Sequence, residues 1–157
     1  AASWLPKGTT GQVTIHSNAP GALIVNSAVY FHDCTTPEVQ AAYLSRGRSG
    51  VNDGLLVGSY NTFLGTTNDL VVQSFESLTT YPVVELLSPN GVLSQVVETL
   101  VGQATKRLSL SSALFGLTPN SYGIAAVQTF DNELTTTAVR VRELAGRVDF
   151  AIAIDFE

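Results

Sequence analysis

The chain has 157 residues, of which 45% are hydrophobic and 13% charged, and its formal net charge is −5. This length suits a single domain with a sizeable core, and because charged residues are about half as frequent as in an average protein, the polar surface must come largely from Ser, Thr, Asn and Gln. The acidic balance, without any basic run, argues against strong nucleic-acid binding by this segment, and no apolar run reaches the roughly 18–20 residues that a membrane-spanning helix needs.

The first part of the chain is predicted to be an arm followed by strands. Residues 1–10 contain Trp4 and a glycine-flanked threonine pair, and we interpret them as an N-terminal arm that contacts a neighbouring molecule. Residues 11–157 are interpreted as one β-sandwich domain. Within it, the β-branched and aromatic residues of 22–31 predict a strand that is buried on both faces.

Two segments carry helix signals. Thr36 can act as an N-cap, Pro37 suits the first helical position and Glu38 suits the positive end of the helix dipole. These residues predict a short helix over about 36–46. A second helix is predicted over about 91–102, because its apolar residues recur with a helical period: Val92, Leu93, Val96, Val97, Leu100 and Val101.

The remaining elements are predicted to be strands. They cover about 54–64, 69–75, 81–87, 107–114 and 122–130, and Pro82 is expected to hold the third of these at a sheet edge. The chain ends in a predicted hairpin that turns at Ala145 and Gly146. A two-residue loop pairs Leu144 with Arg147 and, beyond them, these partners: Arg142 with Asp149, Val141 with Phe150, and Val139 with Ile152.

The sequence contains one place where His, Asp and Cys meet, at His32, Asp33 and Cys34. Neighbouring strand residues point to opposite faces, so His32 and Cys34 share a side and Asp33 does not. A nucleophile and its base need hydrogen-bond reach and a third, orienting group, and we interpret the segment as a strand end. The carboxylates are scattered, and no phosphate loop, zinc signature or serine elbow is present. The prediction is therefore a protein that is not an enzyme.

Two segments together resemble the shell domain of coat proteins from small icosahedral RNA plant viruses, the tombusvirus-like group. One runs from Ala28 through Asp33 to Glu38, and the other covers 146–156. The resemblance implies a mainly β fold, an antiparallel β-sandwich that is jelly-roll-like, and a place in the virion. That family commonly binds calcium between subunits through aspartates after the aromatic residue. Here His32 and Cys34 stand at two of the nearby positions and only Asp33 remains, so no cofactor or metal is predicted.

The leading hypothesis is a structural subunit that self-assembles into a viral capsid, with copies of itself or related coat subunits as partners and no membrane or strong nucleic-acid contact. Weakly charged surfaces suit repeated, symmetric contacts because little charge must lose its water. The candidate subunit contacts are Trp4, Asp33, Arg46 and Arg48.

The alternative hypothesis is a secreted or cell-surface β-sandwich recognition module that binds carbohydrate. Such a module needs exposed aromatic side chains gathered in one patch, and the aromatic residues considered for it are Trp4, Tyr60 and Tyr81.

Overall fold

The computed structural model describes residues 15, 18–19, 25–32, 35–36, 38–46, 52–111 and 113–157, with the backbone only at 52–53 and 130–133. The described elements are, in chain order, β1 (Asn26–His32), β2 (Val39–Arg46), β3 (Asn52–Asn61), the 3-10 turn η1 (Phe63–Gly65), β4 (Thr66–Ser74), β5 (Val83–Ser88), β6 (Gly91–Val97), β7 (Thr105–Ser109), β8 (Tyr122–Leu144) and β9 (Arg147–Asp155). Every pairing among these strands is antiparallel.

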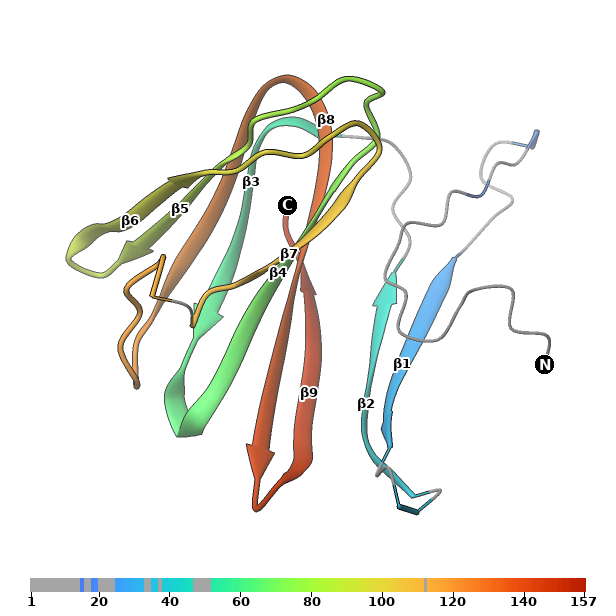
Figure 1. Cartoon of the computed structure of the whole chain (residues 1–157), viewed down its shortest axis with the longest axis vertical. Helices are drawn as coiled ribbons and strands as arrows, with labels where there is room; N and C mark the ends of the chain where they lie inside the picture. Colours follow the sequence, from blue (N-terminus) through green and yellow to red (C-terminus); the bar gives the residue numbers. More distant parts are fainter. Residues whose placement is uncertain are drawn as a thin grey trace.

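Strand β8 organises the fold because it belongs to two layers. Its first part, 122–129, pairs with β3 on one side and β5 on the other. Its last part, 134–144, pairs with β4 and β9. Hydrogen bonds therefore join seven strands into one continuous sheet, which arches over at one end of the molecule into two facing layers (Figure 1). Layer 1 has the order β6-β5-β8-β3, and layer 2 has the order β7-β4-β8-β9.

A long hairpin crosses from one layer to the other beside β8. Its outgoing half is β4 and β5 and its returning half is β6 and β7. The pairing continues through the crossing, where Ser74 N donates to Ala104 O at 3.0 Å and Thr80 pairs with Leu100. The expected antiparallel β-sandwich is confirmed.

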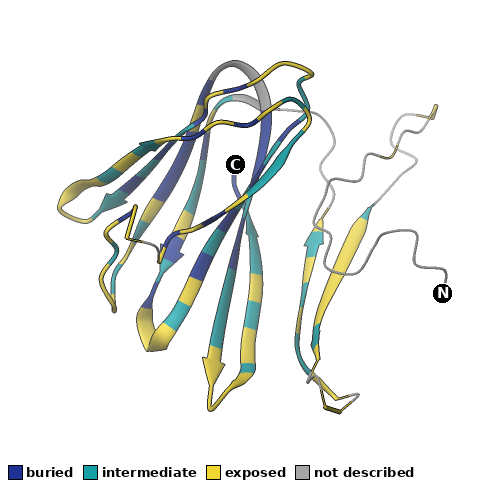
Figure 2. Cartoon of the chain, viewed as in Figure 1, coloured by how far each residue is buried: buried dark blue, intermediate teal, exposed yellow. Residues whose placement is uncertain are grey.

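The core lies between the two layers. Layer 1 contributes Leu56, Val84 and Val127, and layer 2 contributes Leu70 and Val72, all almost fully buried. They alternate with more exposed neighbours along each strand, as a half-buried sheet requires. Figure 2 shows the buried residues concentrated on the strands of the two facing layers.

The C-terminal end ties the two layers together. Phe156 is fully buried, and its ring lies so close to Gly58 that a Cβ there would stand 2.0 Å from it. Val57 N donates to Glu157 O at 2.9 Å and Glu157 N donates to Val57 O at 3.2 Å. The last residues of the chain thus bond to β3 in the other layer.

Both predicted helices are wrong. Residues 39–46 form β2, paired with β1 in a hairpin, and residues 91–97 form β6, paired with β5. The valines of 91–102 are stiff at χ1 and pack well on a pleated surface. In both segments, pairing with a neighbouring strand outweighs a local helix signal. Among the described residues the helical segment is the 3-10 turn η1, and no described helix has the length and apolar content to cross a membrane.

Three finer strand predictions are also corrected. The strands expected at 122–130 and 139–144 are parts of the one strand β8. Strand β5 lies between β6 and β8 rather than at an edge. Pro82 is compatible with this position because it precedes the first residue of the strand, so its missing N–H removes no hydrogen bond between the strands. The strand expected at 22–31 was to be buried on both faces, but its residues 26–31 are mostly exposed.

The C-terminal hairpin turns as predicted, with Leu144 opposite Arg147, but its register then changes. An irregularity between Arg142 and Glu143 places Arg142 opposite Phe150 and Val139 opposite Ala153. The predicted neighbours Arg142 and Asp149 still meet, through side-chain bonds of 2.7 and 3.0 Å. A β-bulge adds one residue to a strand, and a regular register read from the sequence cannot include it.

Candidate functional site

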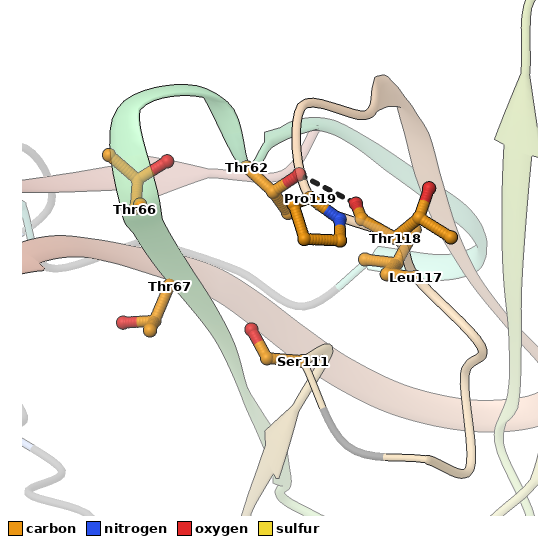
Figure 3. A pocket seen from close by; sticks show the side chains of 8 residues that line it. Thr62, Thr66, Thr67, Ser111, Leu117, Thr118 and Pro119 are labelled. Carbon is orange, nitrogen blue, oxygen red and sulfur yellow. Dashed lines mark hydrogen bonds between the residues drawn. The ribbon is translucent and has the colours of Figure 1, made fainter.

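A hollow of about 260 Å³ lies at the end of the sandwich where β3 turns into β4 (Figure 3). Hydroxyl-bearing and small residues line it: Thr62, Gly65, Thr66, Thr67, Ser111, Leu117, Thr118 and Pro119. None of these side chains ionises. The lining therefore offers no general acid or base.

The hydroxyl groups of the hollow are engaged in holding the loops together. Thr62 Oγ1 accepts from Ser121 N at 2.8 Å and lies 3.1 Å from Thr118 O, to which it can donate. Thr66 Oγ1 donates to Asn61 O at 2.6 Å, and Thr67 Oγ1 donates to Val141 O at 3.3 Å. These bonds give the hollow a structural role.

Ionisable groups are scattered among the described residues. These residues form four ion pairs, Lys106–Glu98, Arg107–Asp69, Arg142–Asp149 and Arg147–Glu38, and of the acidic partners Glu98 is buried. No group of three or more His, Cys, Asp or Glu side chains in the described part of the chain could hold a metal ion.

Arg140 is the half-buried cation between the layers. Its Nε donates to Asn68 Oδ1 at 3.1 Å, and its guanidinium reaches Ser59 O on β3 at 3.3 Å. Burial lowers the pKa of Arg140, but an arginine remains charged throughout the range in which proteins work. Its contacts link β8 in layer 2 to β3 in layer 1.

Of the predicted subunit contacts, Trp4, Asp33 and Arg48 lie outside the described residues. Arg46 is described: it ends β2 opposite Asn26, is exposed, and makes no ion pair with any described residue.

The two described aromatic residues considered for carbohydrate binding, Tyr60 and Tyr81, do not form an exposed patch together. Tyr60 is 1% exposed and belongs to the core, whereas Tyr81 is 62% exposed. Trp4 lies outside the described residues. An exposed aromatic pair exists elsewhere, between Phe63 on η1 and Tyr122 at the start of β8, with ring centroids 6.1 Å apart.

The outer face of layer 1 is apolar. The side chains that alternate with its core residues include Leu55, Val92, Val97, Tyr122 and Ile124, which are 47 to 65% exposed. Cross-strand pairing places them on one face, since Leu55 stands opposite Gln128 and Val83 stands opposite both Gln128 and Val97. Glu85 is the charged side chain of this face among those described. We call these five apolar residues and Glu85 the layer 1 face.

The β1–β2 hairpin carries a second exposed face. Ala28 pairs with Leu44, Tyr30 with Ala42 and Asn26 with Arg46, so these six side chains share one side. Tyr30 is 58% exposed and Leu44 is 71% exposed. We call these six residues the hairpin face.

The opposite side of the hairpin is turned toward the sandwich. Gln40 Oε1 accepts from Val148 N of β9 at 3.0 Å, and Arg147 pairs with Glu38 at 3.1 Å. Burial raises the pKa of Tyr43 on β2, although the charge of Arg107 on β7 opposes this. The hairpin therefore lies beside layer 2, and the layer 1 and hairpin faces lie on opposite sides of the molecule (Figure 1).

Sequence reasoning missed both faces. It predicted strands where β3, β5 and the first part of β8 lie, but it interpreted β2 and β6 as helices and β1 as buried on both faces. Alternation also does not tell which face meets a core when both are apolar. The usable signal was the first part of β8: the run from Tyr122 to Thr129 contains no charged residue.

Comparisons with known proteins bear on the fold. No family model and no curated protein matches this chain. The crystal structure of a Thermotoga maritima protein, 1070, is similar with a TM-score of 0.52 and 10% sequence identity, over 67% of this chain and 93% of that chain. This likeness supports the β-sandwich architecture.

Proposed function

We propose that this chain is a structural subunit that works by associating with copies of itself. The observation that carries the proposal is the pair of exposed apolar faces on opposite sides of the molecule. Large exposed apolar patches mark interaction sites on soluble proteins. A subunit with two such faces can contact two neighbours at once, which assembly requires.

The low charge of both faces supports the same proposal. Layer 1 presents Glu85, which stands opposite Gln95 and Ala126, and the hairpin presents Arg46 at its end. Few charged groups would lose water when such faces meet, so the desolvation cost is small. A viral capsid is the specific assembly that the resemblance to plant-virus shell domains favours.

Sedimentation velocity over a range of protein concentrations tests self-association. We expect species larger than the monomer, in proportions that grow with concentration. A monomer that persists at high concentration would overturn the proposal. Electron microscopy of the assembled fraction distinguishes a capsid subunit from a protein that self-associates in another way, because a capsid subunit yields closed particles of uniform size.

The exposed pair of Phe63 and Tyr122 favours a second candidate function, carbohydrate recognition. Aromatic rings at a surface bind the apolar faces of sugars, and these two rings are 41% and 55% exposed. A glycan array with the wild-type protein and with Phe63→Ala tests this. Binding that the substitution abolishes would support recognition, and an array without any hit would exclude the glycans it displays.

A further inference from the structure

We propose that copies of this chain associate head to tail, with the hairpin face of one subunit packed on the layer 1 face of the next. This inference rests on the proposed function of self-association and specifies its geometry. The alternative is a two-fold contact in which each face meets its own copy. The two arrangements differ in which charged residues are brought together.

The first argument is the shape and polarity of the two faces. Both are pleated β surfaces with apolar side chains, centred on Tyr30 and Leu44 in the hairpin and on Ile124 and Val97 in layer 1. Pleated surfaces of this kind pack face to face about 10 Å apart. Within one chain the hairpin already lies beside layer 2. A head-to-tail contact would add the next subunit's layer 1 on the hairpin's open side.

The second argument is charge complementarity. Arg46 is the cation on the hairpin face and Glu85 the anion on the layer 1 face, and neither makes an ion pair with a described residue. A head-to-tail contact brings opposite charges to one interface. A two-fold contact between layer 1 faces brings Glu85 toward its own copy, and like charges at an interface oppose association. The charges therefore favour the head-to-tail arrangement.

A head-to-tail contact has a consequence for assembly. A head-to-tail dimer still has one open hairpin face and one open layer 1 face, so growth does not stop at a dimer. If the rotation between neighbours closes, the product is a ring or shell, and if it does not, the product is an open row.

Charge reversal tests the inference by sedimentation velocity on the full chain. Arg46→Glu and Glu85→Arg should each raise the apparent dissociation constant about tenfold, because each places like charges at the contact. The double variant Arg46→Glu/Glu85→Arg should recover association. An equimolar mixture of the two single variants should also recover it, since the two chains can alternate in a row.

The control is Glu143→Arg, which makes the same charge change as Glu85→Arg but lies near the β8–β9 turn, outside both faces. It should leave association unchanged. Circular dichroism of each variant verifies folding. A wild-type protein that stays monomeric would overturn the proposed function itself. Wild-type association that neither single reversal weakens would overturn only the head-to-tail geometry. Stronger association of Glu85→Gln, which removes the like charges that a two-fold contact between layer 1 faces brings together, would overturn it in favour of the two-fold contact.

Discussion

Layers 1 and 2 share the strand β8, yet their outer faces differ. In layer 2 the residues facing outward include Thr67, Asp69 and Gln73 of β4, which stand opposite Val141, Val139 and Thr135. In layer 1 they are mainly aliphatic or aromatic. The same contrast runs along β8 itself, whose first part has no charged residue and whose last part contains Arg140 and Arg142.

The inner faces of the two layers are needed for folding, whereas the outer faces are free to serve association. Both layers bury their inner faces against each other, so neither outer face is required for the core. The outer face of layer 2 mixes polar with apolar residues, and Val139 and Thr135 on it are already buried within the chain. An apolar outer face on layer 1 gains free energy only when another surface covers it, and it is there that we place the subunit contact.

The largest effect on stability is expected from removing the side chain that packs between the two layers at the C-terminal end. Phe156→Ala removes a fully buried ring that packs on Gly58. Truncating a buried phenylalanine typically lowers the free energy of unfolding by about 3–5 kcal/mol. Urea denaturation measures the loss. Phe150→Ala, at a ring that is 39% exposed on β9, is the control and should cost much less. Equal losses would contradict the assigned core.

A smaller effect is expected at the polar link between the layers. Arg140→Ala removes the donors to Asn68 Oδ1 and Ser59 O. The loss of hydrogen bonds from a charged, half-buried group should lower the free energy of unfolding by about 1–3 kcal/mol. Arg142→Ala, whose partner Asp149 lies at the surface, should cost less in the same urea titration. The reverse order would show that Arg140 does not connect the layers.

Substitution on the outer faces should separate association from stability. Ile124→Lys places a charge on the layer 1 face, and Ser109→Lys places one on layer 2, where Ser109 stands opposite Asp69. Both positions are exposed, so the free energy of unfolding should change by about 0.5 kcal/mol or less. Sedimentation should show weaker association for Ile124→Lys and unchanged association for Ser109→Lys. Equal behaviour of the two variants would remove the distinction between the faces.

The smallest effect concerns the surface pair at the β8–β9 turn. The hydrogen bond from Arg142 holds the pKa of Asp149 below its ordinary value of 3.8. Because the folded pKa is the lower one, this carboxylate contributes stability above the unfolded pKa and loses it as pH falls through the folded pKa. Wild type should therefore exceed Asp149→Asn in stability near neutral pH, and the difference should shrink in urea titrations below pH 3.8. A difference independent of pH would contradict the pairing.

The sequence predicted the strands whose alternation was regular. Strands β3, β4 and β5 lie close to their predicted ranges, and the turn at Ala145 and Gly146 is where a two-residue loop was expected. It failed at β2 and β6, where a capping pattern and a valine repeat imitate helices. A helix N-cap stabilises a helix by about 1 kcal/mol, and in these segments pairing with a neighbouring strand outweighs that local preference.

The residues of the candidate interaction faces were harder to predict from the sequence than the strands. Arg46 was a predicted subunit contact, but its place on a β-hairpin face could not be known while residues 36–46 were interpreted as a helix. Tyr60 was considered an exposed aromatic and is buried. The period-two pattern assigns residues to two faces without saying which face meets the core.

By itself the sequence determined a low-charge, single-domain β protein, because composition and alternation are local properties that each strand carries alone. Only the tertiary structure decided that β8 serves two layers, that the long hairpin crosses between them, and that the apolar outer face belongs to layer 1. These features depend on which distant segments pair. Backbone hydrogen bonds between strands are the same for every residue pair, so the partner of a strand is settled by the packing of the whole chain.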